Sequence, residues 1–218
     1  MTTAGAHTAR AGYSALGGSV RLFFEPTGAP GVRDGTPTAA FWAPRLAERF
    51  GVAAGSVCIS GGSGERPCLR VEGEAIAASF SRTAGARVCV VAGTGRPDRA
   101  DPIGVDAERV VALPELEDVI ALSTVEEERR GLPSGGPARL RAFFACWTRK
   151  EAVLKAAGCG LRADPRAVRP RRIEGDAEGW NESGPEKGLF FFGGRLYAVE
   201  TTTLGGVVIS AARPAGGA

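Results

Sequence analysis

The longest helical pattern in the chain covers residues 139–157 and ends at Gly158. Its apolar side chains recur every three or four positions and so share one face of a helix; they are Leu140, Phe143, Phe144, Trp147 and Leu154. Glu151 falls on the same face. Burying an unpaired carboxylate costs several kcal/mol, so the pattern predicts a nearby cation, and Lys155 lies one turn further along. The plainer alternative is an ordinary ion pair between Glu151 and Lys155.

Lys150 is the next residue before Glu151 in this helix. Neighbouring positions on a helix are about 100° apart around its axis, so the two side chains diverge. We therefore expect Lys150 to point toward a partner or a second phosphate.

A second chemical signal is the strand candidate I-G-V-D-A-E, residues 103–108. In a strand, Asp106 and Glu108 point to the same face and can share a cation. Oxygen ligands of this kind suit Mg²⁺, and Gly104 lets a ligand approach closely. The alternative interpretation is a solvated sheet edge. The apolar run at residues 87–92 precedes this strand across a Gly- and Pro-rich loop, a pattern that predicts a hairpin.

Composition excludes several classes of protein. With 218 residues, 44% hydrophobic and 23% charged, the chain fits one large or two small globular domains. Its net charge of +3 is too small to indicate nucleic-acid binding. It holds no apolar run of about 18 residues and no signal-peptide pattern, so we expect a cytoplasmic protein without a membrane partner.

Two residue types narrow the chemistry further. The one histidine, His7, lies in a leader-like segment, which argues against a Ser-His-Asp triad or a His-ligated metal. The cysteines form no C-x-x-C pair and are odd in number, so we expect buried free thiols; they are Cys58, Cys68, Cys89, Cys146 and Cys159.

The chain is expected to be an α+β protein. Phe41–Phe50 has helical spacing and Gly51 ends it, while residues 189–212 contain strand candidates separated by glycine pairs. Thr83–Ala92 and Thr203–Ala212 agree at four of ten positions, which a duplication or chance would explain. The expected organisation is a flexible leader, two α+β halves and a flexible tail, at residues 1–18, 19–101, 102–212 and 213–218.

Three carboxylates with a nearby lysine are typical of a phosphoryl-transfer site, where catalysis depends on positioning the reactants and on stabilising charge. Neither a Walker loop nor a kinase signature is present. The segments P-I-G-V-D-A-E at 102–108 and W-T-R-K-E-A-V-L-K-A-A-G-C-G-L at 147–161 resemble the paired signatures of 4′-phosphopantetheinyl transferases of the long, Sfp-like type. G-E-R-P-C-L at 64–69 and S-F-S-R-T at 79–83 resemble two weaker segments of that family.

This resemblance implies a pseudo-dimer of two similar α+β halves, with coenzyme A bound in the cleft between them. It implies Mg²⁺, with Mn²⁺ as an alternative ion, held by Asp106, Glu108 and Glu151. The catalytic residues would be Glu151, as general base, and Lys155, which would bind the pyrophosphate. The further coenzyme contacts are placed on Arg66, Ser81, Arg82 and, for the 3′-phosphate, Arg45; Lys150 is a candidate for a second phosphate.

Two positions depart from the family pattern. Arg82 stands where histidine is common, and Arg66 where lysine is common, so positive charge is kept but a proton-transfer role at 82 would be lost.

The implied reaction moves the phosphopantetheine arm of coenzyme A onto a serine of an apo acyl or peptidyl carrier protein and releases adenosine 3′,5′-bisphosphate. Such carriers serve fatty-acid, polyketide and nonribosomal peptide synthesis, and are expected to dock on loops such as 112–138 of a monomer. The alternative is a catalytically silent protein of the same fold that binds coenzyme A or a carrier. Nucleic acid is not an expected partner.

Overall fold

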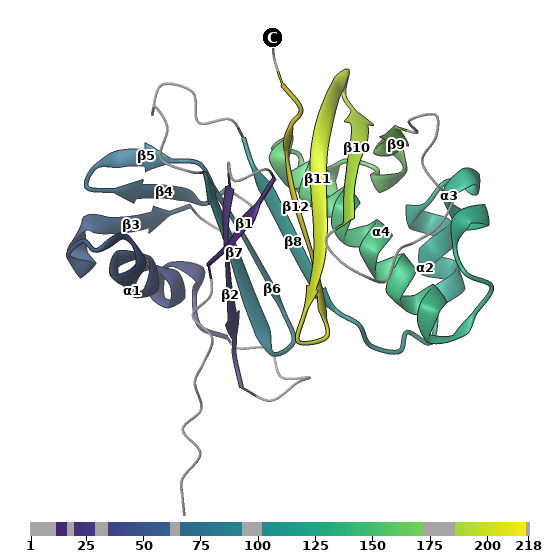
Figure 1. Cartoon of the computed structure of the whole chain (residues 1–218), viewed down its shortest axis with the longest axis horizontal. Coiled ribbons are helices and arrows are strands. Elements are labelled where there is room, and N and C mark those ends of the chain that lie inside the picture. The colour runs from purple at the N-terminus through teal and green to yellow at the C-terminus, as the bar shows by residue number, and fades with distance from the viewer. Residues whose placement is uncertain are drawn as a thin grey trace, which may run out of the picture.

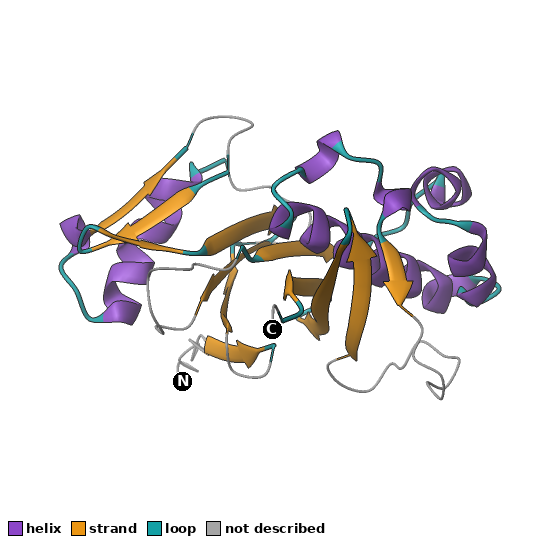
Figure 2. Cartoon of the chain, turned by 90° about the horizontal axis from the view of Figure 1, so that it is seen from above, coloured by secondary structure: helices purple, strands orange, loops and turns teal. Residues whose placement is uncertain are grey.

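The computed structural model describes residues 12–16, 20–28, 35–61, 66–92, 102–171 and 186–216. They form a mixed α+β structure with three antiparallel sheets and covering helices (Figure 1). Seen from above, α1 and a small sheet lie at one end of the molecule and the remaining α-helices at the other (Figure 2). Within these described ranges, no helix combines the length and apolar character needed to cross a bilayer.

The N-terminal part is built on a four-stranded sheet with a helix on one face. In order across the sheet, its strands are β1 (Gly12–Ala15), β2 (Val20–Pro26), β7 (Ala86–Ala92) and β6 (Ala78–Thr83). Helix α1 (Thr38–Phe50) packs Trp42 and Leu46 against this sheet, and Gly51 ends it in the left-handed conformation. A small sheet completes this end, with η1 (Ala54–Ser56), β3 (Val57–Ser60), β4 (Cys68–Val71) and β5 (Glu74–Ile76).

The C-terminal part is built on a five-stranded sheet with a longer helix on one face. Its strands, in order, are β8 (Gly104–Arg109), β12 (Val207–Pro214), β11 (Arg195–Leu204), β10 (Glu186–Phe192) and β9 (Arg169–Arg171). The helical elements are α2 (Leu116–Ser123), α3 (Glu126–Gly131), α4 (Gly136–Ala156), η3 (Gly160–Arg162) and η4 (Pro165–Ala167). Helix α4 covers one face of this sheet, as the contacts of Ala152 and Phe143 show.

Residue alternation decides which side chains reach the interior. On β8, Val105 and Ala107 enter a core shared with the first sheet, which also holds Val88 and Ile209. Because successive strand residues point to opposite faces, Gly104, Asp106 and Glu108 belong to the other face of β8. A sequence of hydrophobic and acidic residues in strict alternation therefore places the acids beside α4.

The two large sheets are joined along one line by side-chain hydroxyls. Val105, Ala107 and Arg109 of β8 donate their backbone N–H groups to Ser79, Ser81 and Thr83 of β6, at 3.0, 3.2 and 3.0 Å. We call this row the hydroxyl seam. The hairpin predicted from residues 87–92 and 103–108 is wrong, because β7 and β8 lie in different sheets and β8 pairs with β12.

The internal echo falls on two hairpins, but its pairing does not align their turns. The turn of β6–β7 is Ala84–Gly85, and that of β11–β12 is Gly205–Gly206. The echo pairs Gly85, the second residue of its turn, with Gly205, the first residue of the other. It also pairs Val88, which lies in the inter-sheet core, with Val208, which packs on the α4 side.

The other expectations have mixed outcomes. The helices at 41–50 and 139–157 and the glycine-separated C-terminal strands are confirmed. Gly12–Ala15, expected in the leader, form β1, and residues 213 and 214, expected in the tail, belong to β12; residues 1–11 and 217–218 lie outside the described residues. The 112–138 region contains α2 and α3 rather than loops alone. All five thiols are free, but Cys58 and Cys68 are exposed.

We expect Gly104→Ala to destabilise the protein by about 3 kcal/mol, because an added Cβ would lie 2.0 Å from the carbonyl oxygen of Ala152 and 2.5 Å from the nitrogen of Ala156. The matched control is Gly131→Ala, where nothing lies within 4 Å of the added carbon. Urea unfolding measures both variants. Equal stability of the two would contradict the close contact between α4 and β8.

Candidate active site

The candidate site lies where α4 crosses β8. The absence of a side chain at Gly104 lets the helix backbone at Ala152 rest directly on the strand. Asp106 lies two residues further along the same face of β8, and Glu151 immediately precedes Ala152. Asp106 is 5% exposed and Glu151 is 4% exposed. The two carboxylates are therefore brought together by the closest approach of helix and strand.

Lys155 provides the positive charge of the site. Its ammonium group lies 2.7 Å from Oδ1 of Asp106 and also donates to the carbonyl of Val105 at 3.1 Å. Ser81 donates to the same carboxylate oxygen at 3.0 Å. The cation predicted beside Glu151 is present, but its ion pair is made across to β8 with Asp106.

One oxygen of each buried carboxylate has no hydrogen-bond partner: Oδ2 of Asp106 and Oε1 of Glu151. Buried polar atoms are normally paired, so these two oxygens are candidates for binding a ligand. The pKa of Glu151 is raised to about 7, chiefly by burial and then by the negative charges of Asp106 and Glu108, against the opposing charge of Lys155. Glu151 is thus electrostatically coupled to both other acids.

Glu108 is half-buried and, like Asp106, accepts a hydrogen bond from the hydroxyl seam. Thr83 donates to its Oε2 at 3.0 Å. Glu108 also lines a cavity whose walls come from β6, β8, the loop after β8, α2 and α4. The apolar lining includes Val111, Leu113, Val119, Phe143, Phe144 and Trp147.

The donor set suits a hard divalent cation, because Mg²⁺ prefers carboxylate oxygens and retains several waters. Among the described residues, no three Asp, Glu, His or Cys side chains are clustered as a complete ligand set. Lys155 is bonded to Asp106 and Thr83 to Glu108, so those acids already have protein partners. The fit rests on the two unpartnered oxygens of Asp106 and Glu151.

The predicted coenzyme contacts lie around this centre at different depths. Arg66 donates to the carbonyl of Ile103 at 2.6 Å, just before β8, and burial lowers its pKa. Arg82 is exposed and, by strand alternation, points away from Ser81. It stands opposite Arg87 in the β6–β7 register, on the α1 side of the sheet.

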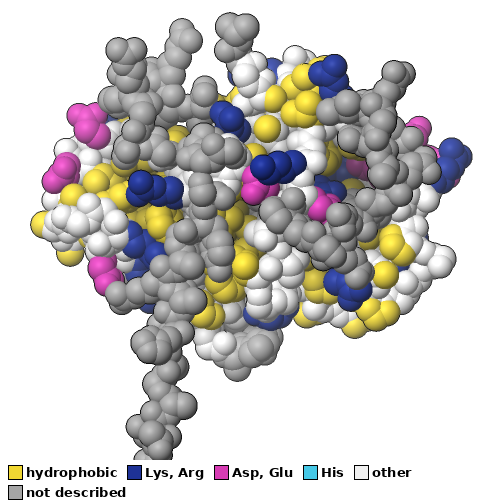
Figure 3. All heavy atoms as spheres, viewed as in Figure 1, with side chains coloured by type: hydrophobic (Ala, Val, Ile, Leu, Met, Phe, Trp, Pro, Cys, Tyr) yellow, Lys and Arg dark blue, Asp and Glu magenta, His cyan; other side chains and the backbone are white. Residues whose placement is uncertain are grey.

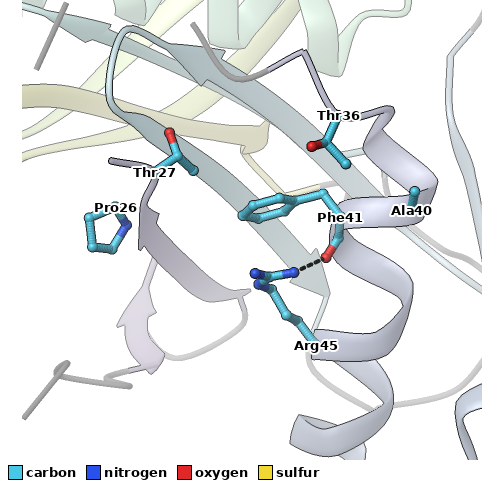
Figure 4. A pocket seen from close by; sticks show the side chains of 6 residues that line it. All are labelled: Pro26, Thr27, Thr36, Ala40, Phe41 and Arg45. Atoms are coloured by element: carbon cyan, nitrogen blue, oxygen red, sulfur yellow. Dashed lines mark hydrogen bonds between the residues drawn. The ribbon is translucent and has the colours of Figure 1, made fainter. Parts of the chain in front are cut away.

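Arg45 lies in a separate pocket on that α1 side (Figure 4). Its guanidinium stacks 3.9 Å from the ring centre of Phe41 and donates to the Phe41 carbonyl at 2.7 Å. Arg87 lies 4.4 Å from the same ring centre. Thr27, across the pocket, has a buried hydroxyl without a hydrogen-bond partner. The lining of this pocket therefore includes one cationic side chain, Arg45, and the hydroxyl of Thr27.

Lys150 does not fit the predicted phosphate contact. It is completely buried, and its ammonium group pairs with Glu128 at 2.8 Å and donates to the carbonyls of Pro165 and Val168, both at 3.0 Å. An ammonium group has three N–H donors, so none remains for a ligand. Lys150 instead ties α3 and the loop around η4 to α4.

Sequence reasoning missed the part played by Thr83. The segment S-F-S-R-T places hydroxyls at every second position, which in a strand puts all three on one face. That alternation is the signal that could have identified the seam and the partner of Glu108.

On the face shown in Figure 3, the described Lys and Arg side chains are scattered among acidic and apolar ones.

The three predicted metal ligands and Lys155 all belong to the C-terminal part. Residues 102–190 match the family model of the 4′-phosphopantetheinyl transferase superfamily. The match covers less than half of the chain and includes both β8 and α4. It supports a phosphopantetheinyl transferase at the level of the superfamily. A comparison with curated proteins finds no match.

In metal-free protein, we expect Glu151→Gln to stabilise the fold at about pH 8 but not at about pH 4. The pKa of Glu151 is about 7 in the folded protein, whereas the ordinary pKa of a glutamate is 4.5. The contribution of this group to stability is therefore present below about pH 4.5 and is lost as the pH rises through about 7. Glutamine cannot ionise and avoids this loss, which is about 1 to 3 kcal/mol. Urea unfolding in a chelator measures it, with the exposed Glu74→Gln as control. If the free energy of unfolding of wild type and of Glu151→Gln changed with pH in the same way, the raised pKa of Glu151 would be refuted.

Proposed function

We propose that this protein is a Mg²⁺-dependent 4′-phosphopantetheinyl transferase of the long, Sfp-like type. It would transfer the phosphopantetheine arm of coenzyme A to a serine of an apo acyl or peptidyl carrier protein. The observation that carries the proposal is the pair of unpartnered, buried oxygens of Asp106 and Glu151 beside Lys155, within the segment that matches the superfamily. Such a centre suits a diphosphate bound through a divalent ion.

The proposed pseudo-dimer is supported by the equivalent connections of the two parts. In each, an early strand (β2 or β8) is followed by a helix on the outer face (α1 or α4), and a later hairpin (β6–β7 or β11–β12) places its second strand beside the early one. We infer that the halves descend from one unit, with equivalence through Gly85 and Gly206. Coenzyme A would bind along their junction.

In the proposed reaction, the carrier serine oxygen bonds to the β-phosphorus of coenzyme A while the bond to the bridging oxygen breaks. Glu151 accepts the serine proton, directly or through water, as a general base. Lys155 offsets charge that develops on the departing diphosphate oxygen. Bound Mg²⁺, held by Asp106, Glu108 and Glu151, would neutralise the phosphate oxygens. Adenosine 3′,5′-bisphosphate leaves.

The two pockets suggest how the ends of coenzyme A are held. The apolar cavity beside Glu108 suits the pantetheine arm, whose length is mostly uncharged. The Arg45 pocket suits the 3′-phosphate, because a guanidinium group that lines it can bind phosphate through charge-assisted hydrogen bonds. Ser81 faces the reacting centre and Arg82 the other side, so the coenzyme would pass around the edge strand β6. Arg66 would contact it near the start of β8.

The carrier and the setting remain parts of the proposal. An acyl or peptidyl carrier of fatty-acid, polyketide or nonribosomal peptide synthesis would present its serine to the centre. We expect the transferase to act as a monomer in the cytoplasm.

We expect Asp106→Asn and Glu151→Gln each to lower transfer at least 100-fold, because one removes a charge from the metal site and the other the proposed base. The readout is the mass gain of a panel of apo carriers incubated with coenzyme A and Mg²⁺. Glu74→Gln, an exposed acid-to-amide change, should behave as wild type. Tight coenzyme A binding by wild type without transfer to any carrier would instead favour the catalytically silent binder.

We expect Arg45→Gln to raise the KM for coenzyme A about ten-fold, the size of a lost charge-assisted hydrogen bond. The KM for 3′-dephospho-coenzyme A should not change, because that substrate lacks the group that Arg45 would bind. Arg70→Gln, at an exposed arginine on β4, is the control. An equal rise with both coenzymes would show that Arg45 does not contact the 3′-phosphate.

A further inference from the structure

A chain of buried hydrogen bonds joins α4 to the sheet beside the candidate centre. Oγ1 of Thr148 lies 2.8 Å from Oγ of Ser210, which lies 2.9 Å from Oγ1 of Thr201. Arg149 donates to Thr201 at 2.9 Å and forms an ion pair with Glu186. Thr148 and Ser210 have no solvent exposure, and Thr201 is 6% exposed.

The contacts at the two ends of the chain let it be fully satisfied. A guanidinium group can only donate, so Thr201 accepts from Arg149. At the other end, Thr148 donates to the carbonyl of Ala145 at 3.3 Å. With that bond made, Ser210 donates to Thr148 and Thr201 donates to Ser210, so each hydroxyl donates once and accepts once. A satisfied buried chain of this kind holds its partners in register.

The chain lies next to both buried acids of the centre. Ser210 is directly opposite Asp106 in the β8–β12 ladder. Thr148 precedes Glu151 by three residues, about one helical turn. On the other side of Glu151, Ala152 rests on Gly104. Glu151 is thus flanked by two fixed points between α4 and the sheet, one polar and one steric.

The polar contact has a property that an apolar one lacks. Val208 and Ala212 lie on the same face of β12 as Ser210 and are buried among the residues that pack with α4. Apolar contacts are not directional and tolerate small sliding movements, whereas a hydrogen bond weakens steeply when its geometry changes. The Thr148–Ser210 bond is therefore suited to fixing the position of α4 along β8 and β12.

We propose that Thr148 and Ser210 are positioning residues that set the Glu151 carboxylate against Asp106 for divalent-ion binding and transfer. The inference rests on the proposed function for its kinetic part and on the carboxylate pair for its metal-binding part. Neither hydroxyl touches substrate; both act through the placement of α4.

The test compares Thr148→Val and Ser210→Ala with Thr148→Ser, which keeps the hydroxyl. We expect the first two to weaken Mn²⁺ binding, followed by electron paramagnetic resonance of the free ion, and to lower kcat, each about ten-fold or more. The KM for coenzyme A should change little, because the coenzyme-contacting side chains are unaltered. Thr148→Ser should restore both values. Ser210→Ala provides a second route if Thr148→Val does not fold.

The control for a merely structural role is Thr124→Val. Thr124 is also a buried threonine; it donates to the carbonyl of Ile120 at the end of α2 and is not a member of the Thr148–Ser210–Thr201 chain. Thr124→Val should lower the stability of the protein but leave kcat and Mn²⁺ affinity unchanged. Unchanged Mn²⁺ affinity and kcat in Thr148→Val and Ser210→Ala, with both lost in Asp106→Asn, would overturn the positioning role.

Two wild-type outcomes separate this inference from the proposed function. If wild type binds Mn²⁺ but transfers to no carrier, the transferase proposal fails, and weakened Mn²⁺ binding in the variants still supports the positioning role. If wild type neither binds Mn²⁺ nor transfers, the centre that these residues would position does not exist, and both proposals are overturned.

Discussion

The candidate site depends on the contact between the backbone of α4 and strand β8 at Gly104. Any larger residue would hold the helix away from the strand, because a Cβ there would overlap the Ala152 carbonyl. The same contact places Glu151 beside the face that carries Asp106, so two carboxylates share a buried region. Burial, and after it the negative charge of Asp106, raises the pKa of Glu151, and Lys155 offsets part of the charge. One oxygen of each acid has no hydrogen-bond partner within the protein, which is the property expected where a cation binds.

The hydroxyl seam links this centre to the N-terminal part. Ser81 accepts from the β8 backbone and donates to Asp106, so one side chain both joins the sheets and orients a site carboxylate. Thr83 makes the same two contacts with β8 and Glu108. Because hydroxyls replace a backbone ladder at this edge, β8 is satisfied without being paired to β6 as a strand. The acidic face of β8 consequently stays beside the junction of the two parts, where a long ligand could reach both.

Local periodicity was enough to predict the elements of the site but not their partners. The helical spacing of Phe143, Trp147 and Leu154 predicted α4 and singled out Glu151, and strand alternation put Asp106 and Glu108 on one face. Lys155 pairs with Asp106, and Lys150 pairs with Glu128. Both pairs depend on how distant segments pack, and the local sequence around each lysine does not reveal that packing. The wrong hairpin has the same origin: β7 and β8 are consecutive in sequence, but β12, about 100 residues later, supplies the better ladder. The α2–α3 region was missed because both helices are short, with eight and six residues, and because α3 has no apolar stripe.

The central claim is that Asp106 and Glu151, with Glu108, hold one divalent ion beside Lys155. Anomalous diffraction from crystals containing Mn²⁺ and coenzyme A tests it most directly, since it locates the ion without reference to activity. The account predicts a single strong peak within coordination distance, about 2 Å, of carboxylate oxygens from both β8 and α4. A peak bound elsewhere, or coenzyme A bound with no metal at these acids, would contradict it.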